Sequence, residues 1–104
     1  MRVFYHLIYE YKKGVKNMML YTLPSSAEKE VVGRLERNTI SYMIQRLGYG
    51  NINVFFGKQE CLNVATRICK DKPLNPLNPE EDFTLGILLG YGIHEQCCRY
   101  WKKQ

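Results

Sequence analysis

The chain has no long hydrophobic run and no recognisable export signal. Its apolar beginning, MRVFYHLIYEY, is interrupted by polar residues and is not followed by a small-residue cleavage site. No stretch approaches the roughly 18 apolar residues that a membrane-spanning helix needs. The sequence also lacks a C-x-x-C pair, and GILLGYG has neither the lysine nor the spacing of a phosphate-binding loop. We therefore expect a cytoplasmic protein without a cofactor, whose cysteines are thiols: Cys61, Cys69, Cys97 and Cys98.

Prolines are few, and negative charge is outweighed by positive charge. With four prolines, 45% hydrophobic and 24% charged residues, the composition is typical of a compact globular chain, and 104 residues fit one domain over 1–104. Fifteen Lys and Arg against ten Asp and Glu give a net charge of +5, which favours an acidic protein or nucleic acid as partner. Solubility alone would explain this charge equally well. The basic residues form no tail and are spread along the chain: Lys12, Lys13, Arg34, Arg37, Arg46, Lys70, Lys102 and Lys103.

Residues 1–38 have the pattern of a strand, a second strand and a helix. Residues 3–11 are rich in aromatic and branched side chains, and residues 18–23 form a second apolar run, so we expect a β-hairpin turning near Gly14. The segment LPSSAEKEVVGRLERN contains the S-x-x-E spacing of a capping box and apolar residues at helical intervals. This pattern predicts a helix over 26–37.

Residues 39–70 repeat the same order. ISYMIQRL and INVFF are strand-like and flank the turn sequence GYGN, and KQECLNVATRIC follows with helical spacing. Residues 71–79 include three prolines and predict a loop, while residues 80–103 predict C-terminal helices, the first beginning at Pro79 and the last covering 93–102. The predicted fold class is α+β, a two-layer sandwich with a four-stranded antiparallel sheet from two β-β-α units plus C-terminal helices.

The first predicted strand has apolar side chains on both faces. Phe4 and Ile8 alternate with Val3, Tyr5 and Leu7, and aromatic residues continue to the end of the segment. A sheet of this kind does not leave its second face open to water. The C-terminal helices, a ligand or a second subunit are the alternatives for covering it, and we expect a homodimer.

Several short patterns have an ordinary structural explanation. GYGNI within residues 47–54 partly matches an RNA-binding strand signature, but Leu47, Asn51 and Val54 depart from it. His6 lies in the middle of a predicted strand, where a histidine is more often structural than catalytic. The PEED acids suit the start of a helix, where the dipole favours negative charge. No catalytic site is predicted from these residues, and an enzyme is the less favoured interpretation.

The segment HEQCC is the strongest candidate for metal or thiol chemistry. On a helix, His94, Cys97, Cys98 and Trp101 share one stripe, which is equally typical of a core-facing surface. A closed zinc site needs four ligands, so Cys61 or Cys69 would have to complete the set. His94, Cys97 and Cys98 therefore remain a weak metal or redox candidate.

Taken together, HLIYEYKKG, NVFFG and PEEDFTLGILLGYG followed by a cysteine and RYW resemble the landmarks of a small bacterial domain family of unknown function. The resemblance covers nearly the whole chain. It implies a stand-alone domain of the bacterial cytosol, and it supplies no activity, cofactor or site residue.

The favoured hypothesis is a non-enzymatic binding or adaptor domain that holds an acidic protein on its aromatic sheet face and the basic residues around it. An acidic redox protein of the flavodoxin type would suit the charge. The alternatives are a nucleic-acid-binding protein, in which Arg34, Arg37, Arg46 and Lys58 contact phosphates while Tyr49 and Phe55 stack on bases, and a thiol- or metal-dependent protein. The candidate binding residues are aromatic or basic: Tyr5, His6, Tyr9, Arg34, Arg37, Arg46, Tyr49 and Phe55.

Overall fold

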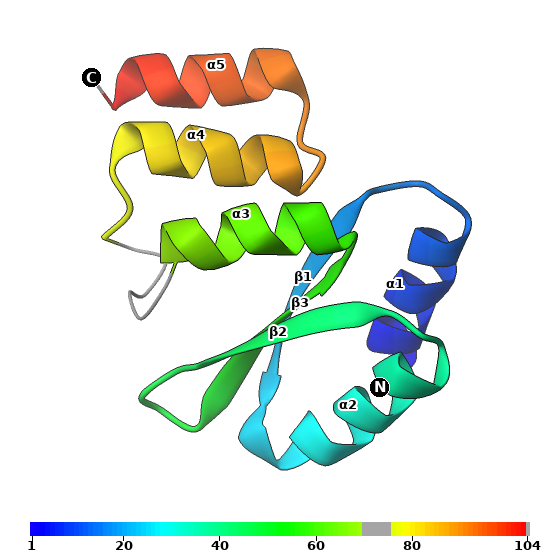
Figure 1. Cartoon of the computed structure of the whole chain (residues 1–104). Coiled ribbons are helices and arrows are strands. Elements are labelled where there is room, and N and C mark those ends of the chain that lie inside the picture. Colours follow the sequence, from blue (N-terminus) through cyan, green and yellow to red (C-terminus); the bar gives the residue numbers. More distant parts are fainter. Residues whose placement is uncertain (70–75, 104) are drawn as a thin grey trace.

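The computed structural model describes residues 1–69 and 76–103, and combines helices with one antiparallel sheet (Figure 1). In chain order the elements are α1 (Arg2–Lys12), β1 (Met18–Pro24), the 3-10 helix η1 (Ser25–Ala27), α2 (Glu28–Arg37), β2 (Ser41–Arg46), β3 (Asn51–Gly57), α3 (Gln59–Cys69), α4 (Pro79–Leu88) and α5 (Ile93–Lys102). None of the helices in these ranges is long and apolar enough to cross a membrane. The predicted α+β class is confirmed.

The sheet has three strands in the order β1–β3–β2, and both neighbours of β3 are antiparallel to it. A polar row crosses all three strands at one level: the Thr22 hydroxyl donates to Asn53 Oδ1 at 2.6 Å, and Asn53 Nδ2 donates to Gln45 Oε1 at 3.0 Å. Asn53 is buried, and a shift of one residue would turn its side chain toward the opposite face. The row therefore helps to specify the register of the sheet.

Helices cover both faces of the sheet, which corrects the predicted two-layer arrangement. Ile52, Val54 and Phe56 of β3 belong to a core with the buried residues of α1 and α2, whereas Phe55 belongs to a second core with those of α3 and α4. Alternate side chains of a strand point to opposite faces, so α1 and α2 lie on one face and α3 and α4 on the other. The sheet face that we expected to bind a partner is therefore covered by the chain's own helices.

The prediction of a first strand over residues 3–11 is wrong, because this segment forms α1. Phe4 and Ile8, four residues apart, are buried with 0% and 5% of their surface exposed, whereas Val3 and Tyr9 are 55% and 56% exposed. This is the period of a helix with one apolar side, not of a strand with two. The expected hairpin at Gly14 is instead a helix-to-strand turn, and the sheet has three strands where four were predicted.

The other elements agree better with the sequence. The second hairpin and the starts of α4 and α5 are as predicted, and α2 ends at Arg37. The expected S-x-x-E capping box of α2 is absent, since its N-cap is Ala27 with no capping side chain. A capping box forms instead on α4, where Asn78 Oδ1 accepts from the Glu81 amide at 2.8 Å and the Glu81 carboxylate accepts from the Asn78 amide at 3.1 Å. Most of the predicted 71–79 loop lies outside the described residues.

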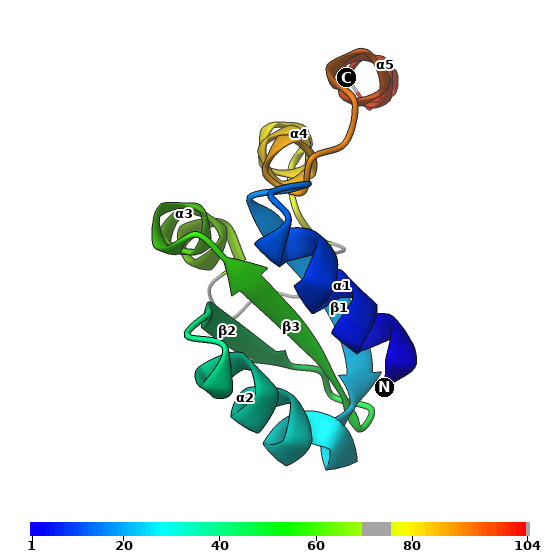
Figure 2. The same cartoon turned by 90° about the vertical axis from the view of Figure 1, so that its right-hand side faces the viewer.

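Helices α3, α4 and α5 form a row that leads away from the sheet, with α5 farthest from it (Figures 1 and 2). Arg99 donates to Asp82 through Nε at 2.7 Å and Nη2 at 3.1 Å, and Lys103 Nζ lies 3.4 Å from the same carboxylate. The buried amide of Gln96 lies against Gly86, where any Cβ would overlap it. The position of α5 is thus supported by the Asp82 ion pairs, by a hydrogen bond from the Tyr100 hydroxyl to the Glu80 carboxylate at 2.6 Å, and by a glycine that permits close approach.

Replacing Asp82 by asparagine should loosen α5. The hydrogen bonds from Arg99 hold the pKa of Asp82 below its ordinary value of 3.8, although burial opposes them. The carboxylate therefore stabilises the fold above this value, and the stabilisation is lost as the pH falls through the lower pKa of the folded protein. We expect the free energy needed to open α5 to fall by about 0.5–1 kcal/mol at neutral pH. Amide hydrogen exchange in α5 should then be about two- to fivefold faster.

Arg99→Gln is the partner variant for this experiment. It should have a similar effect, and the double replacement should add little, because both changes remove the same ion pair. Fully additive losses, or unchanged exchange in α5 after Asp82→Asn, would show that Asp82 does not hold this helix.

Candidate functional site

Positive charge is unevenly distributed between the two halves of the chain. Residues 1–58 contain nine Lys and Arg against four Asp and Glu, whereas residues 59–104 contain six of each. The whole net charge of +5 therefore belongs to α1, α2 and the sheet, and the part that forms α3, α4 and α5 is neutral. The cations of the first part are Arg2, Lys12, Lys13, Lys16, Lys29, Arg34, Arg37, Arg46 and Lys58.

Helices α1 and α2 lie side by side and run in the same direction (Figure 2). The Tyr5 hydroxyl donates to the Glu30 carboxylate, and Lys12 Nζ donates to Asn38 Oδ1 at 3.0 Å. Glu30 follows Tyr5 by 25 positions and Asn38 follows Lys12 by 26. Because the two offsets are nearly equal, the start of α1 contacts the start of α2 and the end of α1 contacts the end of α2. The parallel packing brings the C-terminal ends of both helices, with their cations, to one end of the molecule.

A groove of about 170 Å³ lies between these helices. Ile8 is buried beneath it, so the base is apolar, while phenol, ammonium, guanidinium and amide groups surround it. The volume suits one side chain of a partner rather than a drug-sized ligand, whose pockets begin at about 300 Å³. The lining residues are Tyr5, Ile8, Tyr9, Lys12, Arg34 and Asn38.

Arg34 is held in place by an aromatic ring. Its guanidinium carbon lies 3.9 Å from the centroid of the Tyr5 ring, which is a cation–π contact that restricts the side chain before any ligand arrives. Within residues 1–69 and 76–103, the buried Nε of Arg34 has no hydrogen-bond partner. Lys13 Nζ lies 5.3 Å from the ring of Tyr9, which also lines the groove, whereas Lys58 Nζ lies 5.7 Å from the ring of Tyr11, which does not. Two rings of the groove, Tyr5 and Tyr9, therefore each contact a cation.

Several of the predicted binding residues meet at this groove. Tyr5, Tyr9 and Arg34 line it, and the exposed His6 ring stacks beside Tyr9 at 6.2 Å between centroids. Arg37 lies one turn after Arg34 and is exposed. The structure therefore brings together residues that the sequence analysis chose from separate segments.

The other three predicted binding residues, Arg46, Tyr49 and Phe55, do not lie at the groove. Arg46 forms a two-point ion pair with Glu28, which lowers the pKa of that carboxyl through hydrogen bonding. Tyr49 is 73% exposed at the turn of the second hairpin. Phe55 is fully buried in the core beneath α3 and α4, so its ring is not at the surface.

Sequence reasoning missed Lys12, Asn38 and Ile8 as site residues. The missing signal was the period of α1, because Tyr5, Ile8, Tyr9 and Lys12 have the spacing i, i+3, i+4 and i+7 that places them on one side of a helix. An assignment of this segment as a strand put Tyr5 and Lys12 on opposite faces. Asn38 is joined to them only by tertiary packing.

The HEQCC stripe faces solvent, neither the core nor α3. His94, Cys97 and Cys98 are exposed, Trp101 is 79% exposed, and α4 separates α5 from α3 (Figure 1). Cys98 Sγ lies 3.7 Å from His94 Nε2, one turn earlier. Among the described residues, no group of three or more His, Cys, Asp or Glu side chains is placed to hold a metal ion.

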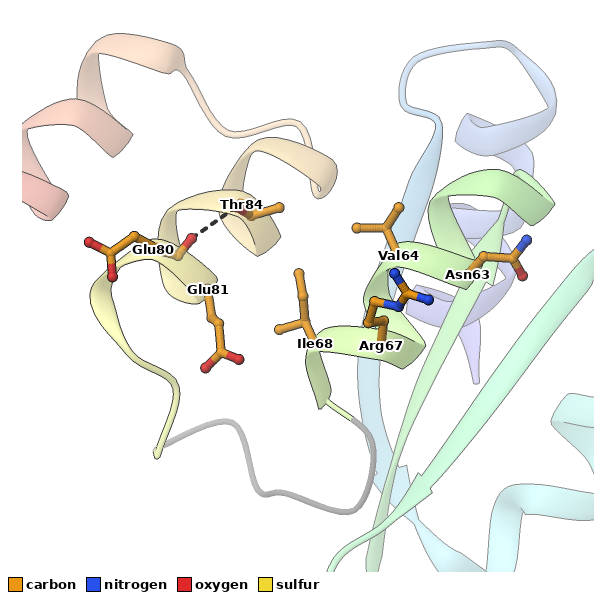
Figure 3. Close-up of a pocket in the computed structure, with 7 residues that line it drawn as sticks. All are labelled: Asn63, Val64, Arg67, Ile68, Glu80, Glu81 and Thr84. Carbon is orange, nitrogen blue, oxygen red and sulfur yellow. Dashed lines mark hydrogen bonds between the residues drawn. The ribbon is translucent and has the colours of Figure 1, made fainter.

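A larger pocket of about 520 Å³ lies between α3 and α4 (Figure 3). Val64 and Ile68 of α3 and Thr84 of α4 point into the space between the helices, and the Thr84 hydroxyl donates to the Glu80 carbonyl at 2.9 Å. Arg67 and the acids Glu80 and Glu81 come from opposite sides of the pocket, so its charges are mixed. It does not share the excess positive charge of the α1–α2 groove.

Comparison with known proteins places the chain in a family. None of the curated proteins matches it. A family model described as "Protein of unknown function (DUF2023)" matches residues 2–103, which confirms the resemblance to a small domain family of unknown function. Because this match covers nearly the entire chain, the protein belongs to the DUF2023 family.

Proposed function

We propose that the protein is a non-enzymatic binding or adaptor protein that docks an acidic protein on the groove between α1 and α2. The observation that carries the proposal is the confinement of the whole +5 charge to residues 1–58, together with a groove in that half whose walls carry Lys12 and Arg34. Charge of this kind accelerates encounters with an acidic surface and orients the complex.

The groove has the chemistry to receive an Asp or Glu side chain. Lys12 and Arg34 provide cationic donors for the carboxylate, while Ile8 and the rings of Tyr5 and Tyr9 contact its aliphatic part. The contact between Arg34 and Tyr5 orders the guanidinium in advance, so less side-chain entropy is lost on binding.

An acidic protein fits these features better than nucleic acid does. Binding to single strands without sequence preference needs exposed rings along a continuous basic track. Phe55 is in the core, Arg46 is engaged by Glu28, and Tyr49 and Lys58 lie beyond opposite ends of β3. A seven-residue strand is about 20 Å long, which separates these two residues too widely for one stacking site.

Titration of the isotope-labelled protein with purified flavodoxin and with a glutamate-rich peptide tests this proposal. We expect NMR shift changes confined to α1 and α2, with an affinity that falls as salt is added. Lys12→Glu should weaken binding about tenfold, or ~1.4 kcal/mol, because it places a negative charge at the groove. Arg67→Glu makes the same change of charge on α3 and should leave binding nearly unaltered.

The outcomes separate the alternatives. Binding of the peptide but not of flavodoxin supports the α1–α2 groove as a site for acidic side chains and excludes flavodoxin-type redox proteins as the partner. Equal weakening by Lys12→Glu and Arg67→Glu indicates general charge attraction and overturns the site. Tight, steeply salt-dependent binding of a single-stranded oligonucleotide, without binding of either acidic probe, replaces the proposal by the nucleic-acid alternative.

A further inference from the structure

Helix α5 exposes an apolar stripe along the flank beside its contact with α4. Ile93 and Trp101 are 70% and 79% exposed, and the exposed Cys97 lies midway between them. Residues four apart lie on nearly the same side of a helix, so these three side chains form one line about 12 Å long. Trp101 is the chain's only tryptophan, and such a side chain is energetically prominent when it is buried at an interface.

A second apolar feature adjoins this stripe. A groove of about 490 Å³ runs between α4 and α5, with the rings of Phe83, Tyr100 and Trp101 and the thiol of Cys97 among its walls. The rings of Phe83 and Tyr100 meet edge to face at 5.6 Å, so this wall is already ordered. The groove lies at the C-terminal end of α5, beside Trp101.

The charge of this half of the molecule favours a second copy of the same chain as the occupant. Residues 59–104 carry six cations and six acids, so two copies that meet through α5 do not oppose net charges. Approach through α1 and α2 would instead bring together two surfaces that each carry the excess of +5. An acidic protein is attracted to α1 and α2 and gains no such attraction at α5.

We propose that two copies of the chain pair through α5, with the two helices antiparallel about a twofold axis at Cys97. The stripe is complementary to itself, because Ile93 and Trp101 are each four residues from Cys97. In the antiparallel pair, Ile93 of one copy meets Trp101 of the other and enters the groove between α4 and α5, and the two Cys97 thiols lie close together. A twofold interface of this kind uses the same patch on both copies.

This pairing is independent of the acidic partner proposed above, because it uses the opposite end of the molecule. Sedimentation velocity of the full chain without partner should give twice the chain mass of 12.3 kDa. Trp101→Glu should give the mass of a monomer with unchanged circular dichroism. Tyr49→Glu is the matched control, since it replaces another highly exposed aromatic residue on the second hairpin and should leave the dimer intact.

Crosslinking locates the axis. In a Cys61→Ser background, the variant that keeps Cys97 (Cys98→Ser) should be joined efficiently by a short bismaleimide. The variant that keeps Cys98 (Cys97→Ser) should be joined poorly, because Cys98 points about 100° away around α5. A monomeric native chain at high concentration, a Trp101→Glu variant that still dimerises, or crosslinking through Cys98 rather than Cys97 would overturn the proposal.

Discussion

Replacing Phe4 by alanine should lower the free energy of unfolding by about 3–5 kcal/mol. Phe4 is fully buried, and its ring lies 5.5 Å from that of Phe56 and 6.4 Å from that of Tyr21, so it joins α1 to the two strands beneath it. Alanine leaves a cavity that is enclosed by the sheet and cannot readily collapse. Urea unfolding followed by circular dichroism measures the loss.

Val3 provides the matched control for this variant, because it is the neighbouring residue and is 55% exposed. Val3→Ala should change the stability by no more than about 0.5 kcal/mol. Comparable losses at Phe4 and Val3 would indicate a segment covered on both sides, as in the strand that the sequence predicted, and would contradict the helix.

The strand prediction failed because local propensity and tertiary packing disagree in this segment. Val3, Tyr5 and Tyr9 are residue types that favour strands. As a strand they lie on the face opposite Phe4 and Ile8, so both faces read as apolar and the sheet was expected to be covered on both sides. The buried pair Phe4 and Ile8 obeys the helical period, but this period is visible only if the exposed aromatic residues are discounted. The amino-acid types alone do not say which rings are exposed.

Elements with strong local signals were predicted well. The second hairpin turns where Gly50 adopts a φ of +86°, which the GYGN sequence permits at little cost. Helix α4 begins at a proline followed by three acids, and α5 occupies the range expected for it. In these places the residues that determine the structure are close neighbours in the chain.

The candidate groove was only partly predictable for the same reason. Aromatic and basic character singled out Tyr5, Tyr9 and Arg34, but only the parallel packing of α1 on α2 brings them to one place with Lys12 and Asn38. Phe55 was chosen on residue type alone, and its place in the central strand buries it. Whether a ring is buried depends on what packs against it, and the periodicity of a single strand does not contain that information.

Replacing Gly57 by alanine should reduce stability by about as much as the loss of the Phe4 ring. Gly57 has a φ of +147°, a region that side chains rarely adopt, and a Cβ at this position would overlap the carbonyl oxygen of Asn17 and lie 2.8 Å from the Cα of Met18. Backbone strain of about 1–3 kcal/mol adds to a similar cost of overpacking. We expect a loss of about 3 kcal/mol or more, because Gly57 ends the central strand and pairs with both of its neighbours.

Variants at two other glycines distinguish the cost of backbone strain from the cost of steric overlap. Gly14 has a φ of +81° but open space around its Cα, so Gly14→Ala should lose only about 1 kcal/mol. Gly48 lies in the second hairpin with neither a positive φ nor a neighbour within 4 Å, and Gly48→Ala should change stability by no more than about 0.5 kcal/mol. Chemical denaturation of the three variants should therefore rank Gly48, Gly14 and Gly57 in order of increasing loss. A loss at Gly57 no larger than at Gly14 would mean that β1 moves aside, and that the close approach of Asn17 to the end of β3 is not needed to hold the sheet together.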